Sequence, residues 1–148
     1  MSKIKDSREA TFIGRRTDGS TLRRPLSPHL QVYDMVQITS GLSIANRITG
    51  CAWTVGLIFM VWWLVAAAAG PQAFANVQWF LSSFLGILIL LGMTAAAWFH
   101  TLGGIRHLVW DAGFAYDLPS THRSGQAVMI GTGVMTVLTW LVAIIAWA

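Results

Sequence analysis

The stretch His100-Thr-Leu-Gly-Gly-Ile-Arg-His-Leu-Val-Trp-Asp111 closes a long apolar run, in which no Asp, Glu, Lys or Arg occurs from residue 48 to residue 105. One helix cannot account for this run, because a hydrocarbon layer of about 30 Å needs only about 20 residues at a rise of about 1.5 Å each. Gly70-Pro71 offers a break between two helices. The sequence therefore predicts two membrane spans, over about residues 43–69 and 77–109.

The composition of the chain is that of a membrane protein. Of its 148 residues, 55% are hydrophobic and only 11% are charged, whereas soluble domains carry about 25% charged residues. A third span is expected over about residues 124–147, which contain no charge. We therefore expect an all-α integral membrane protein with a three-span domain in residues 43–148. The polar segment before it, residues 1–42, includes a short amphipathic piece expected at the membrane surface.

The basic residues gather on one side of this three-span arrangement. Eight of the ten Lys and Arg residues lie in residues 1–47, and the other two are Arg106 and Arg123, beside the loop between spans two and three. This distribution places the N-terminus and the 110–123 loop in the cytoplasm or the mitochondrial matrix. The net charge of +4 then reflects topology and contact with membrane lipid, and does not indicate nucleic-acid binding.

One face of the second span combines histidine with glycine. On a helix the following residues share that face: His100, Gly103, Gly104, His107 and Asp111. The paired glycines admit two explanations. They can allow another helix to approach closely, or they can leave room for a planar cofactor held by one histidine, since ionisable groups inside a membrane are usually functional.

The spacing of the two histidines limits what they could hold. They lie about 10.5 Å apart along a helix axis, which is too close for two haems stacked in one bundle, so one haem is the most that this chain suggests. A second axial ligand must then come from elsewhere. His100 is the better candidate ligand because its nearest charges lie downstream, which places it deeper in the membrane. His107 is level with Arg106 and Asp111, and is the better candidate for contact with a haem propionate.

A second polar cluster lies at the start of the first span. Ser43, Asn46, Arg47 and Gly50 share a helical face. A lone arginine at this depth often extends its charge to the membrane interface and has no further role. However, span two returns to the same side, so Arg47 and the histidine face should lie at similar depths. Ser43 and Arg47 could then bind a quinone carbonyl, or Arg47 could neutralise a haem propionate.

Three motifs occur in order along the chain: Arg24-Pro-Leu-Ser-Pro-His-Leu30, Ser43-Ile-Ala-Asn-Arg-Ile-Thr-Gly50 and His100-x-x-x-Gly-Ile-Arg-His-Leu-x-x-Asp111. Together they resemble the signatures of the succinate dehydrogenase cytochrome b subunit, the larger membrane anchor of respiratory complex II in its alphaproteobacterial and mitochondrial form. The resemblance extends over residues 24–148, including the three spans and their orientation.

The resemblance implies a subunit of succinate:ubiquinone oxidoreductase that carries no succinate-oxidising chemistry and no catalytic residue of its own. Such a subunit joins a second, smaller membrane-anchor subunit and binds one haem b between the two. It docks the iron–sulfur subunit, which is bound to the flavoprotein subunit, and electrons from succinate reach ubiquinone on that side. The implied location is the bacterial inner membrane with a cytoplasmic N-terminus, and the mitochondrial inner membrane is the less favoured alternative.

Individual residues follow from the matching motifs. His100 matches the axial ligand of the haem iron, and Ser43 and Arg47 match the quinone-site serine and arginine. Asn46 departs from the family, which often has histidine before this arginine, and an asparagine cannot carry a charge. Two alternatives stay open: the cytochrome b anchor of another respiratory dehydrogenase, which usually has more spans and histidines, and a haem-free membrane anchor whose glycines only pack helices.

Overall fold

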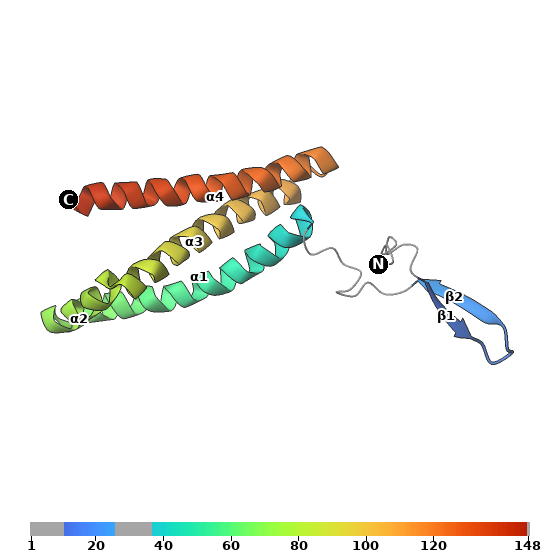
Figure 1. Cartoon of the computed structure of the whole chain (residues 1–148), viewed down its shortest axis with the longest axis horizontal. Helices are drawn as coiled ribbons and strands as arrows, with labels where there is room; N and C mark the ends of the chain where they lie inside the picture. Colours follow the sequence, from blue (N-terminus) through green and yellow to red (C-terminus); the bar gives the residue numbers. More distant parts are fainter. Residues whose placement is uncertain (1–10, 26–36, 148) are drawn as a thin grey trace.

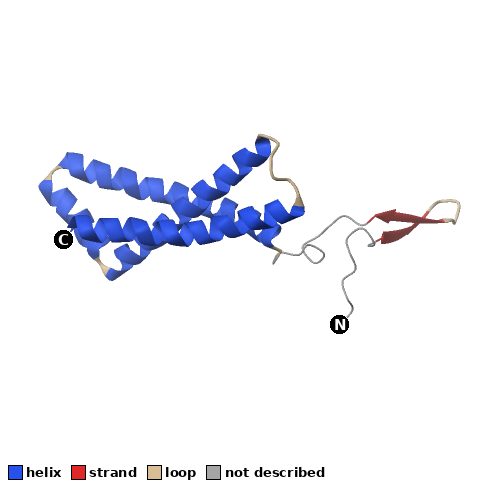
Figure 2. Cartoon of the chain, turned by 90° about the horizontal axis from the view of Figure 1, so that it is seen from above, coloured by secondary structure: helices blue, strands red, loops and turns tan. Residues whose placement is uncertain are grey.

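The computed structural model describes residues 11–25 and 37–147, and these residues form four helices and one small sheet (Figures 1 and 2). The helices are α1 (Ile38–Ala69), α2 (Pro71–Ser82), α3 (Phe84–Asp111) and α4 (Leu118–Trp147). Within the described residues, α1, α3 and α4 are long and apolar enough to cross a membrane. The predicted all-α, three-span class is therefore confirmed.

The first two helices are separated at Gly70. This residue has a φ of 120°, which side chains disfavour, and Pro71 then occupies the first position of α2, where its missing N–H is no loss. The helix α2 turns back along α1, and aromatic rings join them: Phe80 stacks on Phe59 at 6.5 Å between ring centroids. Near the turn, Phe74 meets Trp63 edge-on at 5.7 Å.

A second break, which the sequence did not reveal, divides the expected span of residues 77–109 between α2 and α3. Ser83 has an extended backbone, and its hydroxyl donates to the Phe80 carbonyl over 2.6 Å and accepts the Gly86 N–H over 3.1 Å. These bonds end one helix and cap the next. A side chain at Gly86 would overlap the Phe80 carbonyl, so the bend depends on a glycine there.

The helix α3 lies between α1 and α4 and contacts both. The helices α1 and α4 meet near the start of each, where a Cβ on Gly125 would come 2.7 Å from Leu42 and 3.3 Å from Ile38. Farther along, α4 runs apart from α1 and α2 (Figure 1). Many large apolar side chains of the three spans are exposed, which suits contact with lipid or with another membrane subunit.

The polar N-terminal segment contains a β-hairpin, which the sequence analysis did not anticipate. Strands β1 (Thr11–Arg15) and β2 (Thr21–Pro25) pair antiparallel, with Ile13 opposite Arg23. In the connecting turn Gly19 has a φ of 85°, and the N–H and hydroxyl of Ser20 both donate to Asp18, which lowers the pKa of this carboxyl. The expected amphipathic surface piece and most of the first family motif lie in residues 26–36, outside the described residues.

Candidate functional site

The imidazole of His100 lies against the backbone of α1. Its Nδ1 is 3.0 Å from the main-chain carbonyl oxygen of Asn46. Because a carbonyl can only accept, Nδ1 must carry the hydrogen, and in the neutral ring Nε2 then keeps its lone pair. Gly50 lies directly beside the ring: a Cβ there would come 3.0 Å from Cε1 and 3.3 Å from Nδ1 of His100. The chain thus presents a half-buried histidine with one nitrogen bonded and one available.

Asn46 makes a second contact across the same interface, through its side chain. A Cβ on Gly103 would overlap Asn46 Oδ1, so the absence of a side chain at Gly103 is what admits the asparagine. Oδ1 is buried and has no hydrogen-bond donor among the residues that the structure describes. Buried polar atoms are nearly always paired, so this atom marks a site where a donor is still needed.

The adjacent glycines Gly103 and Gly104 have different environments. Gly103 is buried and packs against α1, as the explanation by helix packing requires. A Cβ on Gly104, by contrast, would meet no described atom within 4 Å. The single glycine notch expected from the sequence is in fact two surfaces, one filled by Asn46 and one open.

Arg47 and Ser43 lie on α1 beside this contact. Asn46 and Gly50, which both touch His100, bracket Arg47 in the sequence, so arginine and histidine lie at the same level of the bundle. Ser43 is one helical turn before Arg47. Arg47 is exposed and Ser43 is half-buried, and neither side chain makes a hydrogen bond or ion pair with any residue in the described ranges. Both side chains are therefore free to bind a group from outside this chain.

His107 lies two turns beyond His100 on α3. Its ring meets Trp110 edge-on, with centroids 5.4 Å apart, and Asp111 is exposed. Residues 11–25 and 37–147 contain no group of three or more His, Cys, Asp or Glu side chains that could hold a metal ion. A haem iron differs in this respect, because it takes its protein ligands as single axial residues.

Arg106 has a structural environment that the sequence analysis missed. Its side chain is only 8% exposed. Its Nε donates to Ser124 Oγ over 2.9 Å, its Nη2 donates to the Thr121 carbonyl over 3.1 Å, and the guanidinium lies 3.9 Å from the Trp110 ring centroid. A tryptophan four residues after an arginine on one helix is a sequence signal for such a cation–π contact. Arg106 thus joins α3 to α4, and it shares the Trp110 ring with His107.

The loop between α3 and α4 is held by its own hydrogen bonds. Ala115 has a φ of 61°, and its carbonyl accepts from Trp110 Nε1 over 3.1 Å. Asp117 accepts the Ser120 N–H over 3.0 Å at the start of α4, and the hydrogen bonds from Ser120 lower the pKa of this carboxyl. Hydrogen bonds to α3 and within the start of α4 therefore fix the conformation of this loop.

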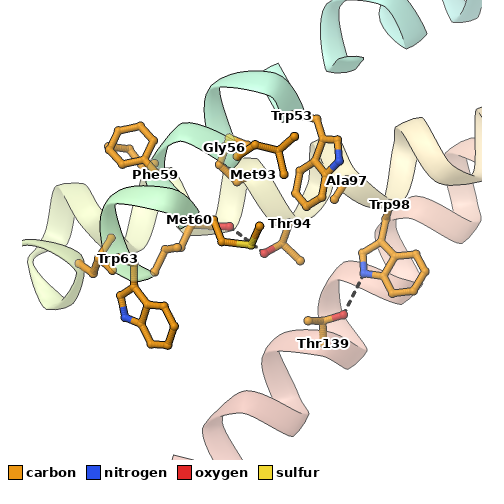
Figure 3. A pocket seen from close by; sticks show the side chains of 14 residues that line it. Trp53, Gly56, Phe59, Met60, Trp63, Met93, Thr94, Ala97, Trp98 and Thr139 are labelled. Atoms are coloured by element: carbon orange, nitrogen blue, oxygen red, sulfur yellow. Dashed lines mark hydrogen bonds between the residues drawn. The ribbon is translucent and has the colours of Figure 1, made fainter. Parts of the chain in front are cut away.

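An apolar cavity of about 560 Å³ lies farther along the bundle, between α1, α3 and α4 (Figure 3). Trp53, Met60 and Met93 line it, together with Trp98, whose Nε1 donates to Thr139 Oγ1 over 2.9 Å. No charged residue lines this cavity, and His100 is not part of it. It is thus separate from the polar cluster around His100.

The sequence pattern of the family described as succinate dehydrogenase/fumarate reductase transmembrane subunit matches residues 20–143. The chain belongs to this family. It is 47% identical over 119 residues to the succinate dehydrogenase cytochrome b556 subunit of Paracoccus denitrificans, which covers 80% of this chain and 91% of that relative. The cytochrome b556 subunit of Rickettsia conorii is 38% identical, over 80% of this chain and 92% of the relative.

More distant relatives carry a similar name. The mitochondrial succinate dehydrogenase cytochrome b560 subunit of Bos taurus is 33% identical, over 76% of this chain and 68% of the relative. The resemblance read from the three motifs is therefore confirmed, and it favours succinate dehydrogenase over another respiratory dehydrogenase. Family membership gives the chain the role of a multi-pass membrane anchor, of the cytochrome b type, in the succinate dehydrogenase complex.

Proposed function

We propose that His100 supplies one axial ligand to a single haem b, which this chain holds together with a second, smaller anchor subunit. The observation that carries this proposal is the hydrogen bond from His100 Nδ1 to the Asn46 carbonyl. Histidines that bind metal usually donate their other ring N–H to a carbonyl or carboxylate, which fixes the tautomer and the ring orientation. The donor set of this site therefore fits a haem iron at Nε2.

The haem would supply one-electron redox chemistry when bound. The part of this chain is to hold and orient it. Gly104, beside the histidine on α3, leaves open space where a side chain would otherwise stand. His107 is proposed as a partner for a haem propionate, and Arg47 offers a permanent positive charge for the same purpose. The side-chain amide of Asn46 can donate hydrogen bonds but cannot carry the charge of a protonated histidine.

We propose that Ser43 and Arg47 form part of a ubiquinone-reduction site. Both side chains are free of partners within the described ranges, and both can donate a hydrogen bond to a quinone carbonyl. They lie at the level of His100, so a quinone bound there would be close to the proposed haem. Succinate would be oxidised on the flavoprotein subunit, and electrons would arrive through the iron–sulfur subunit, so no succinate-oxidising residue is assigned to this chain.

The proposed location is the bacterial inner membrane, with the N-terminus and the α3–α4 loop on the cytoplasmic side. The one-sided distribution of Lys and Arg supports this orientation. The iron–sulfur and flavoprotein subunits would dock on that side. Bacterial relatives favour this membrane over the mitochondrial inner membrane.

Replacing the proposed ligand tests the haem assignment. His100→Leu removes the imidazole with little change in volume, so the reduced-minus-oxidised spectrum of the purified complex should lose its low-spin bis-histidine bands. His107→Leu is the matched control and should only perturb them. The opposite pattern would assign the ligand to His107. A wild-type complex without haem would favour the haem-free anchor, whose helix packing Gly103 explains equally well.

A further inference from the structure

Gly50 occupies a position in α1 where glycine needs a reason. It lies in the interior of a 32-residue helix, where alanine is intrinsically better, and no turn or positive φ requires it. The reason is the ring of His100. A Cβ on Gly50 would come 3.0 Å from Cε1, 3.3 Å from Nδ1 and 3.8 Å from Nε2, so even one methyl group would press on the edge that carries both ring nitrogens.

The second constraint on the ring comes from the preceding turn of α1. The carbonyl of Asn46 accepts the Nδ1 hydrogen over 3.0 Å. A carbonyl oxygen has two lone pairs, so it can accept from the histidine as well as within its own helix. Thr49 Oγ1 also lies 3.0 Å from this oxygen, but its one hydrogen can be donated instead to the Ala45 carbonyl, 2.9 Å away. The hydrogen bond limits rotation of the ring, and the bare backbone at Gly50 limits its tilt.

We propose that the backbone of α1, through the Asn46 carbonyl and the surface of Gly50, is the positioning element for the haem ligand His100. This inference rests on the proposed haem function. It assigns to Gly50 the role of a positioning residue, because it acts only through the histidine. It also assigns Nε2 as the nitrogen that binds iron.

The hydrogen bond from His100 Nδ1 should also influence the midpoint potential of the haem. A hydrogen bond from Nδ1 makes the imidazole a stronger donor to the metal, which favours the oxidised iron. Gly50→Ala would displace the His100 ring by a few tenths of an ångström. The hydrogen bond from Nδ1 to the Asn46 carbonyl would then lengthen. The haem midpoint potential should therefore rise, and the low-spin signal in electron paramagnetic resonance should shift. Gly50→Leu should displace the ring further and give high-spin or depleted haem.

A matched control is available in α4. Gly133 also lies inside a helix, and a Cβ there would meet no described atom within 4 Å. Gly133→Ala and Gly133→Leu should leave the potential and the low-spin signal of the assembled complex unchanged. Wild-type properties in both Gly50 variants would overturn the proposal. A wild-type complex that lacks haem, or one in which His100→Leu keeps its spectrum, would instead overturn the haem assignment.

The hydrogen bond can be tested separately with a cavity variant. His100→Gly removes the imidazole, and free imidazole or 1-methylimidazole can be supplied to the purified complex. Imidazole can bind iron through one nitrogen and donate to the Asn46 carbonyl through the other, whereas 1-methylimidazole cannot donate. Imidazole should restore the low-spin spectrum at a concentration about two- to tenfold lower than 1-methylimidazole does. Equal concentrations for the two compounds would show that the carbonyl does not hold the ligand.

Discussion

The two sides of α3 treat polar groups in opposite ways. Toward α4, the guanidinium of Arg106 contacts Ser124, Thr121 and Trp110, and two of its nitrogens donate hydrogen bonds inside the chain. Toward α1, polar atoms are left over: Asn46 Oδ1 has no donor among the described residues, and His100 uses only Nδ1. The difference distinguishes a structural contact, whose polar groups are paired within the chain, from the proposed binding site, whose polar groups would be paired by a group from outside the chain.

The largest expected effect, on the stability of the complex, comes from removing the contacts of Arg106 between α3 and α4. Arg106→Met keeps roughly the length of the side chain but removes the hydrogen bonds from the guanidinium to Ser124 Oγ and to the Thr121 carbonyl, which keeps only the bond from Ser124 Oγ among its side-chain donors. Each hydrogen bond to a charged group contributes about 1.5–3 kcal/mol, so the loss should reach about 3 kcal/mol. The measurement is the amount and thermal stability of the assembled complex.

Arg106→Met should leave the proposed haem and quinone sites intact. The complex that does assemble should keep its haem spectrum and its ubiquinone reduction per haem. Arg123→Met, at an exposed arginine of α4, is the control and should change neither quantity. An Arg106→Met complex of normal stability that cannot reduce ubiquinone would place Arg106 in the binding site. The α3–α4 contact would then not be purely structural.

A smaller effect, on activity alone, is expected from replacing the polar side chains of α1 that have no partner in the described residues. Arg47→Ala removes a charged donor worth about 1.5–3 kcal/mol, so succinate–ubiquinone reduction should fall roughly ten- to a hundredfold. Succinate oxidation by an artificial dye should be nearly unchanged because the proposed function assigns the flavin chemistry to another subunit. Ser43→Ala should act in the same direction.

Assembly must be measured first for these α1 variants, and Arg123→Ala serves as the control for loss of an exposed arginine. If an assembled Arg47→Ala complex reduces ubiquinone at the wild-type rate and affinity, Arg47 only marks the membrane interface. The quinone assignment on this chain would then fail.

The smallest effect should come from the neutral contact between α3 and α4. Trp98→Phe removes the hydrogen bond to Thr139 and keeps most of the apolar surface. Hydrogen bonds between membrane helices average about 0.6 kcal/mol, so thermal stability should fall slightly and the haem spectrum should not change. Trp79→Phe, at an exposed ring of α2, is the control. A loss of haem in Trp98→Phe would connect the apolar cavity to the cofactor site.

The sequence predicted the class of fold well because membrane helices can be recognised from amino-acid composition alone. A long uncharged run and the Gly70-Pro71 pair are enough to predict separate membrane helices. The break at Ser83 was missed because serine is common inside membrane helices, and its capping role depends on the bend that Gly86 permits. The hairpin was missed because the strands are short and polar.

The sequence named residues for the candidate site, which stay a prediction, but it could not give the contacts that these residues make. Motif and depth pointed to His100, Arg47 and Ser43. The separate environments of Gly103 and Gly104 depend on where α1 crosses α3, which no pattern within one helix can give. The partner of His100 is equally hidden, since it is a backbone carbonyl and every residue has one.

The depth of Arg47 on α1 has an electrical consequence. The uncharged part of this helix, residues 48–69, measures about 33 Å at about 1.5 Å per residue, which matches a hydrocarbon layer of about 30 Å. Arg47, and with it the level of His100, therefore lies at one edge of the layer. Moving one elementary charge across 100 mV requires about 2.3 kcal/mol. Electrons delivered and protons taken up at the proposed site would therefore not cross the field, and quinol would form there at the same rate in an energised and a de-energised membrane.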